Sequence, residues 1–217
     1  MHGLRGVHEP PGVCTARVDR ERDTGWVATE KGERRRAALV AAAADLLRTG
    51  GFEAVRHRAV AEKAGLPLAS TTYYFASLDD LVTAATERTC SDELAEVRTG
   101  LDALPADAPP AALAELVLDQ LLGPESRSSG LEAVLLRYER LVGSGRRPYL
   151  APLMRATRSD FDALLAAILA RAGHELDVPA LHRLVAVVDG TVVNSLIEAD
   201  PDPRAAARAA LLAELTT

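Results

Sequence analysis

Cysteine, aromatic residues and long apolar runs are all scarce in this sequence of 217 residues. The two cysteines, Cys14 and Cys90, supply neither a disulfide framework nor the spacing of a metal site, and both suit a reducing cytoplasm. No continuous apolar run approaches the ~20 residues of a membrane span. The first thirty residues lack the apolar stretch of a secretory signal. These absences predict a cytoplasmic protein that is not exported and does not cross a membrane.

Signals of catalysis are also missing. His174, Glu175, Asp177 and His182 are close in the sequence, but a predicted helix break separates them and their spacing matches no HExxH-type zinc site. No serine lies in a nucleophile-elbow pattern. Asp189 is a single carboxylate on a predicted helix, and we interpret it as structural. The sequence therefore predicts a protein that is not an enzyme, with no catalytic residues, no metal and no cofactor.

Charge is distributed unevenly along the chain. Residues 1–30 carry a net charge of −1, residues 31–81 of +2 and residues 82–217 of −7. A mildly basic segment beside an acidic one suits binding of a polyanion at one end of the molecule. Arg17, Arg20 and Arg22 offer a second basic group, although acidic residues interleave with them.

The fold predicted from the apolar periodicity is all-α, with about nine helices. Ala, Leu and Val dominate, which favours closely packed helices, and no strand-like alternation of useful length occurs. Residues 1–30 have prolines, scattered charge and no sustained period, so we predict a disordered tail. We predict loops at 104–110 and 123–130 and a linker at 143–145. The expected helices cover 34–48, two short segments within 57–75, 77–104, about 111–122, 131–142, 149–172, 177–199 and 204–215.

The segment 57–81 has the pattern of a helix-turn-helix, in which the second helix enters the DNA major groove. Gly65 lies where the chain needs a positive φ, Leu66 anchors the turn, and Pro67 suits the start of the next helix. Hydroxyl-bearing residues follow on a helix of about two turns. Such a short helix needs support from the rest of the head to be stable.

Residues 31–81 also resemble the DNA-binding domain of the tetracycline-repressor (TetR) family of bacterial transcription regulators. The resemblance rests on the helix 34–47, Gly50-Gly51-Phe52, Val60-Ala61 with Ala64-Gly65, Tyr74-Phe75, and Ser77 with Leu81. Two positions depart from the family pattern, because Thr72 replaces a tyrosine and Leu78 replaces a lysine that would contact phosphate. The resemblance implies a three-helix head (31–81) and a helical ligand-binding and dimerisation body (82–217).

Candidate DNA contacts come from both short helices. Ser70, Thr71 and Tyr73 offer groups that reach base edges or phosphates. The resemblance assigns phosphate contacts to Thr72 and Tyr74. It also implies that Arg58, on the preceding helix, can reach DNA. The full set of predicted DNA-binding residues is His57, Arg58, Ser70, Thr71, Thr72, Tyr73 and Tyr74.

Candidate ligand contacts are polar or bulky residues within apolar stretches of the body. They are Gln120, Arg137, Tyr138, Met154, Arg155, Thr157, Arg158 and Phe161. The last two predicted helices, about 179–215, carry small residues that allow close helix approach, as a bundle formed by two subunits requires. The combined prediction is a homodimeric repressor that binds a near-palindromic double-stranded operator and leaves it when a small-molecule effector binds.

Two other classes of function remain open on the sequence alone. The first is a helical small-molecule-binding protein or enzyme whose DNA-binding head is degenerate, which the changes at Thr72 and Leu78 would favour. The second is a nonspecific architectural DNA-binding protein, against which the acidic body argues.

Overall fold

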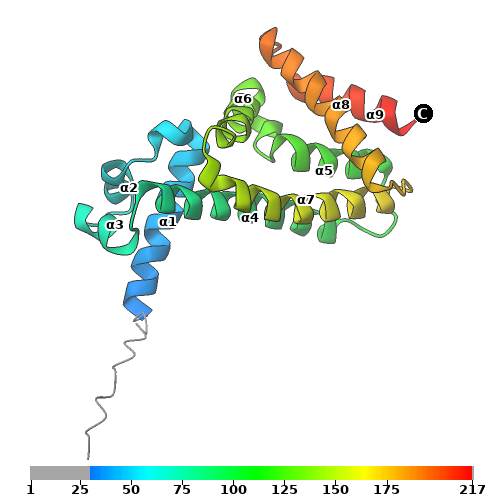
Figure 1. Ribbon diagram of the computed structural model, residues 1–217. Helices are drawn as coiled ribbons and strands as arrows, with labels where there is room; N and C mark the ends of the chain where they lie inside the picture. Colours follow the sequence, from blue (N-terminus) through cyan, green and yellow to red (C-terminus); the bar gives the residue numbers. More distant parts are fainter. Residues whose placement is uncertain (1–29, 217) are drawn as a thin grey trace, which may run out of the picture.

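The computed structural model describes residues 30–216, which are almost entirely helical and contain no strand (Figure 1). The predicted tail, with its three arginines, lies outside the described residues except for Glu30. The elements are α1 (Glu30–Ala54), α2 (His57–Lys63), α3 (Leu68–Tyr74), α4 (Leu78–Ala103), α5 (Pro110–Leu122), α6 (Ser126–Ser144), the 3-10 turn η1 (Pro148–Leu150), α7 (Ala151–Arg171), α8 (Val178–Ile197) and α9 (Pro203–Leu215). The prediction of an all-α fold with about nine helices is confirmed.

Three helix starts predicted from capping residues are confirmed. The Ser77 Oγ accepts a hydrogen bond from the Asp80 backbone N–H (3.0 Å) at the start of α4. The Asp177 and Asp202 carboxylates accept from the N–H groups of Ala180 and Ala205 at the starts of α8 and α9. Each cap satisfies a backbone donor that the first helical turn leaves without a partner.

The head consists of α1, α2 and α3, and it shares its core with the first turns of α4. Leu39, Leu47, Val60 and Phe75 pack with Leu81 in one buried cluster. The head contributes few large side chains of its own, so it depends on α4 for its apolar contacts. The lower end of α1 projects away from this cluster (Figure 1).

Two helix boundaries differ from the prediction. Helix α1 was expected at 34–48, but helical hydrogen bonding runs from Glu30 to Ala54 across a break at Gly51, which has a φ of 64°. Helix α6 was expected at 131–142, but it begins at Ser126, bends at Gly130 and ends at Ser144.

The predicted linker at 143–145 is therefore wrong, and packing against the head explains the difference. Gly143 lies in the last turn of α6, where a Cβ would come within 3.2 Å of the Phe52 ring. The absence of a side chain lets the end of α6 approach the end of α1 closely. The Arg147 guanidinium covers the Phe52 ring at 3.8 Å from its centre.

The body surrounds a second core made by α4 to α9. Helices α4 and α7 run alongside each other from the head to the far end of the body, with α5 packed against both (Figure 1). Helices α8 and α9 pack against each other as a hairpin, and the last turns of α8 line a groove together with Phe52 of the head. Val97, Leu118, Val134, Leu165, Val188 and Leu211 bring one residue each of α4, α5, α6, α7, α8 and α9 into this one cluster.

Helix α8 has a mean hydropathy of 1.3, which by length and composition would suit a membrane span. The sequence predicts no membrane span, because no continuous apolar run approaches the ~20 residues that a span requires. Leu184, Val188 and Val192 of α8 are buried in the body core. One such helix is weak evidence for a span, since core helices of globular domains share this composition.

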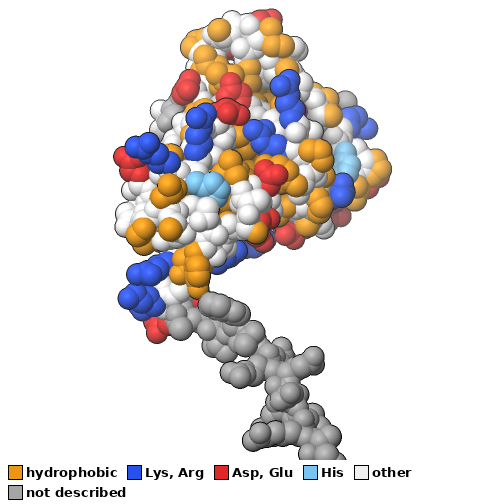
Figure 2. All heavy atoms as spheres, turned by 60° about the vertical axis from the view of Figure 1, so that its left-hand side comes forward, with side chains coloured by type: hydrophobic (Ala, Val, Ile, Leu, Met, Phe, Trp, Pro, Cys, Tyr) orange, Lys and Arg blue, Asp and Glu red, His pale blue; other side chains and the backbone are white. Residues whose placement is uncertain are grey.

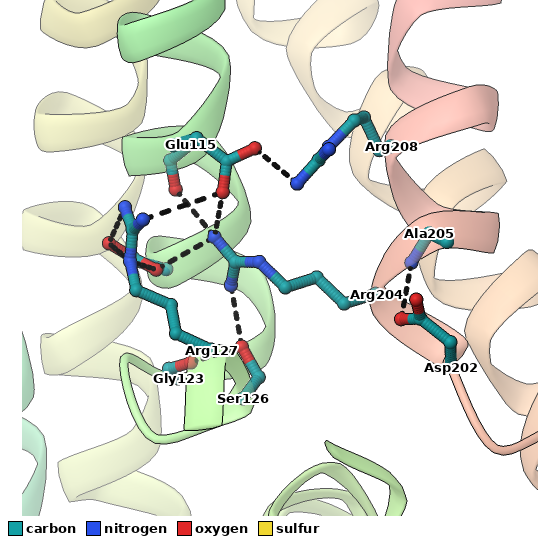
Figure 3. A network of polar contacts seen from close by, with 9 residues as sticks. Glu115, Gly123, Ser126, Arg127, Asp202, Arg204, Ala205 and Arg208 are labelled. Atoms are coloured by element: carbon teal, nitrogen blue, oxygen red, sulfur yellow. Dashed lines mark hydrogen bonds and ion pairs between the residues drawn. The ribbon is translucent and has the colours of Figure 1, made fainter. Parts of the chain in front are cut away.

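A buried ionic network ties α9 to α5 and to the start of α6. The Arg204 guanidinium donates to the Ser126 Oγ (2.6 Å), to a Glu115 carboxylate oxygen (2.7 Å) and to the Asp119 carboxylate (2.9 Å). Arg127 pairs with the same two carboxylates. In Figure 3 the Arg204 side chain reaches from α9 toward Glu115 and Ser126. The network fixes the position of the last helix relative to the body core.

Candidate functional site

The turn between α2 and α3 has a defined hydrogen-bond pattern. The Gly65 N–H donates to the Glu62 carbonyl (3.1 Å) and the Leu66 N–H donates to the Ala61 carbonyl (3.0 Å). Gly65 has a φ of 63°, as this type of helix end requires. Leu66 packs against the head core. The predicted turn is confirmed, and it sets the direction in which α3 leaves the head.

Helix α3 presents part of the predicted DNA-contact set at the surface. The Tyr73 side chain is 64% exposed, Thr72 is exposed and Ser70 is half-buried. Tyr74 is half-buried against the head core, and its ring meets that of Tyr73 edge to face at 4.9 Å.

The prediction for Thr71 is wrong. Its side chain has no exposed surface, and its hydroxyl donates to the Leu68 carbonyl (2.8 Å). On a helix of seven residues that must pack one face against the head, Thr71 lies on the inward face. It holds α3 in place and is not available to DNA.

The first turn of α2 adds a basic residue to the same part of the head. Arg58 is exposed, and none of the ion pairs among residues 30–216 includes it. His57 is half-buried, and its Nδ1 is buried without a hydrogen-bond partner. Figure 2 shows basic side chains gathered at the tip of α1, and others interleaved with acidic and apolar ones over the head. Lys31, Arg34, Arg35 and Arg36 are exposed basic residues in the first two turns of that helix.

The body contains a cavity of about 170 Å³ between α4, α5, α6, α7 and α8. Most of its exposed surface is apolar, although six charged side chains contribute to the wall. The lining residues are Thr86, Cys90, Glu93, Leu94, Val97, Asp119, Gln120, Leu121, Arg137, Arg140, Leu141, Ser144, Met154, Thr157, Arg158, Phe161, Val185 and Asp189. A largely apolar cavity with a small number of polar groups is the usual form of a small-molecule site.

Six of the eight predicted ligand residues lie in this wall, and two do not. The six are Gln120, Arg137, Met154, Thr157, Arg158 and Phe161. Arg155 is exposed and does not line the cavity; on α7 the inward residues follow helical spacing, and Arg155 falls one position outside it. Tyr138 is buried behind the wall, where its hydroxyl donates to the Asp189 carboxylate (2.7 Å).

Glu93 of α4 binds two buried arginines of α6. Its two carboxylate oxygens accept from Arg137 and Arg140. Burial alone would raise the pKa of Glu93, but the two guanidinium groups outweigh that effect and lower it. Arg137 also donates to the carbonyls of Gln120 and Leu121, both at 3.0 Å. This cluster joins three helices of the cavity wall, and the sequence did not reveal it because its members lie 44 and 47 residues apart.

Asp189 is paired with Tyr138, as its interpretation as a structural carboxylate predicts, and it also lies in the cavity wall, which the sequence did not predict. The only available signal was a carboxylate in an otherwise apolar helix, which by itself does not distinguish a buried pair from a ligand contact.

A helix-turn-helix head joined by one long helix to a body with an internal cavity defines a DNA-binding regulator that responds to a ligand. Comparison with known proteins gives the particular family. Residues 39–85 match the model for bacterial regulatory proteins of the tetR family, and residues 108–217 match the tetracyclin repressor-like C-terminal domain.

Solved structures agree with these two matches. The multidrug binding protein EbrR complexed with proflavin is 32% identical, with a TM-score of 0.60, over 83% of this chain and 99% of that one. A TetR family member from Streptomyces coelicolor A3 (SCO1917) is 31% identical, with a TM-score of 0.56, over 83% and 97% of the two chains. No match is found among proteins with curated descriptions. The chain belongs to the TetR family, whose members are transcriptional regulators and not enzymes.

Proposed function

We propose that this protein is a repressor that binds its operator through α2 and α3 and is released when a small molecule enters the cavity of the body. The observation that carries the proposal is that one helix serves both sites. The N-terminal part of α4 contributes Leu81, Val82 and Ala85 to the head core, and a later part contributes Glu93 and Val97 to the cavity wall. A shift of α4 on ligand binding would therefore move the head.

The energetics of release follow from linkage. An effector weakens operator binding only if it binds the DNA-free conformation more tightly, and DNA must then weaken effector binding by the same factor. In a dimer the two heads would read half-sites roughly 34–36 Å apart in successive major grooves. The structures of EbrR with proflavin and with ethidium support a small aromatic molecule as the kind of effector that this fold accepts.

The proposed domain division is a DNA-binding head at 31–81 and a ligand-binding and dimerisation body at 82–217. We propose that the protein acts in the cytoplasm and is associated with the nucleoid when bound to DNA. The predicted head contacts that the structure leaves accessible are Arg58, Ser70, Thr72, Tyr73 and the half-buried His57 and Tyr74.

Arg58→Gln should lower operator affinity about tenfold, because it removes one phosphate or base-edge contact. The slope of log affinity against log salt concentration should also fall by about one. The measurement is a fluorescence-anisotropy titration at several salt concentrations, with a duplex footprinted in the DNA that flanks the protein's own gene. Arg98→Gln, at an exposed arginine of α4 in the body, is the matched control and should leave both quantities unchanged.

Unchanged binding by Arg58→Gln would contradict the proposed reading face. Binding by the unaltered protein that is weak and independent of salt would instead favour the alternative, a helical small-molecule-binding protein with a degenerate head. Equal affinity for unrelated duplexes would favour an architectural DNA-binding protein.

The proposed dimer interface lies on α8 and α9. Both helices leave large apolar side chains exposed, with Ile197 76% and Leu212 48% exposed. Gly190 and Ala209 are exposed small residues on the same two helices. Apolar side chains beside small residues suit close packing of helices from two subunits.

Ile197→Asp should convert the dimer to a monomer at micromolar concentration, because the interface would bury an unpaired charge. Light scattering coupled to size-exclusion chromatography measures the mass directly. Leu68→Asp, at an exposed leucine of the head, is the control and should remain dimeric. A dimer of Ile197→Asp as stable as that of the unaltered protein would show that the interface lies elsewhere.

A further inference from the structure

We propose that the cavity binds an organic cation and that Asp189 is the residue that recognises its positive charge. The proposal rests on the proposed function in one respect, namely that this cavity is the effector site. It adds the chemical class of the ligand and the side chain that selects it.

The three carboxylates of the cavity wall differ in how their charge is balanced. Glu93 is paired with two arginines, and Asp119 is paired with Arg127 and Arg204. Asp189 has no basic partner within ion-pair distance among the described residues 30–216, and its recorded contact is the hydroxyl of Tyr138. A carboxylate in a mostly apolar wall with only a neutral donor is the group that a cation would stabilise most.

Tyr138 does not neutralise this carboxylate. Burial raises the pKa of the Tyr138 hydroxyl, and the neighbouring Asp189 raises it further. The tyrosine therefore stays protonated and acts as a hydrogen-bond donor that orients the carboxylate. The hydroxyl of Tyr138 thus gives Asp189 a neutral hydrogen-bond partner and not a charged one.

The arginines of the wall are already engaged, which argues against an anionic ligand. Arg137 donates to the backbone carbonyls of Gln120 and Leu121 in the last turn of α5, so it faces the negative end of that helix. Arg137 and Arg140 share the single negative charge of Glu93, which leaves one positive charge in excess. The negative end of the α5 dipole partly offsets this excess. Arg158 pairs with Asp162 at 2.8 Å.

The rest of the wall indicates the body of the ligand. Leu94, Val97, Met154 and Phe161 give it an apolar surface, and the Arg158 guanidinium lies over the Phe161 ring at 5.5 Å from its centre. The side chain of Gln120 lies in the wall with its Nε2 buried and without a partner. A small rotation of the Gln120 side chain would let its Nε2 donate a hydrogen bond to an acceptor on the ligand. The class that fits is an aromatic, singly charged cation.

Three tricyclic probes of similar size and different charge test the proposal: proflavin (cation), acridone (neutral) and acridine-9-carboxylate (anion). Their affinities for the DNA-free, full-length protein are measured by isothermal titration calorimetry at pH 7. We expect proflavin to bind at least about tenfold more tightly than either of the others, a difference of about 1.4 kcal/mol. Equal or tighter binding of the carboxylate would overturn the proposal and point to Arg140 as the charge-recognising residue.

Asp189→Asn removes the charge but keeps an acceptor for Tyr138. This variant should weaken proflavin binding about tenfold or more and change acridone binding less than twofold. Asp160→Asn makes the same chemical change at an exposed position of α7 and should change neither. If Asp189→Asn is shown by circular dichroism to be unfolded, the preference of the unaltered protein among the three probes still decides the question. Proflavin binding that is the same in Asp189→Asn would overturn the role of Asp189.

Operator release is measured separately, so the two proposals can fail independently. Because proflavin intercalates into DNA, release is compared between the unaltered protein and Asp189→Asn at the same dye concentration. Charge-selective binding without release would leave this inference standing and contradict the effector role of the cavity. Release that occurs equally in both proteins would contradict the inference and leave ligand-controlled repression in place.

Discussion

Glu93→Gln is expected to lower the free energy of unfolding at pH 7 by about 3–5 kcal/mol, the usual cost of removing one partner from a buried ion pair. The reason is that Arg137 and Arg140 are both buried and share Glu93 as their carboxylate partner. The neutral amide would leave two guanidinium groups in the apolar interior without a compensating charge. The loss should also loosen the contact between α4 and α6 in the cavity wall.

Urea unfolding followed by circular dichroism at a fixed protein concentration measures this effect, because dimerisation makes apparent stability depend on concentration. Glu96→Gln is the matched control, since Glu96 is an exposed glutamate on the same helix and should change stability by less than about 0.5 kcal/mol. A loss below 1 kcal/mol for Glu93→Gln would show that the two arginines find other partners.

The ion pairs of Glu93 with Arg137 and Arg140 also predict that the free energy of unfolding depends on pH. The pKa of Glu93 in the folded protein lies below its ordinary value of 4.5, so its stabilising contribution is complete above about pH 4.5. It is lost as the pH falls through the lowered pKa, because the unfolded chain takes up the proton first. The difference in stability between the unaltered protein and Glu93→Gln should therefore be constant from pH 5 to 7 and shrink below pH 4.5.

Arg204→Met is expected to lower the free energy of unfolding by about 3 kcal/mol. Methionine has a similar length, so the main change is the loss of the charge. The side chains of Arg204 and Asp119 are 7% and 8% exposed, and Asp119 would keep only Arg127 as a partner. The Ser126 hydroxyl would lose its arginine donor, and Glu115 would keep Arg127 and Arg208 as partners.

The control for this variant is Arg208→Met. Arg208 pairs with the same Glu115, but its side chain is 48% exposed, so its loss should cost less than about 1 kcal/mol. Both variants are compared by urea unfolding and by their mass in solution. Because Arg204 fixes α9 to the body, its loss should also weaken the proposed dimer; equal stability of the two variants would contradict a structural role for the buried network.

Local patterns determined much of this protein without any tertiary information. Helical periodicity gives the all-α fold, because a stripe of apolar residues at helical spacing must be buried against something. The caps at Ser77, Asp177 and Asp202, and the break at Gly65, depend on side chains and backbone angles within three or four residues. The family resemblance of the head also comes from a contiguous stretch of about fifty residues.

Contacts between distant segments decided the rest. The apparent linker after Val142 is helical because Gly143 packs against Phe52, ninety-one residues earlier in the chain. Thr71 faces inward and Arg155 faces outward because of the way α3 and α7 are rotated about their axes against neighbouring helices. Apolar periodicity alone predicts this rotation only to within about one residue.

The charge pairing in the cavity wall was also decided by contacts between distant segments of the chain. Glu93 and Asp189 are ordinary acidic residues in the sequence, and their roles depend on which charges lie opposite them. The tertiary structure surrounds Glu93 with two arginines and gives Asp189 a neutral tyrosine. Because charge balance in a low-dielectric interior is set by neighbours in space, only the folded chain shows which of these carboxylates has basic partners.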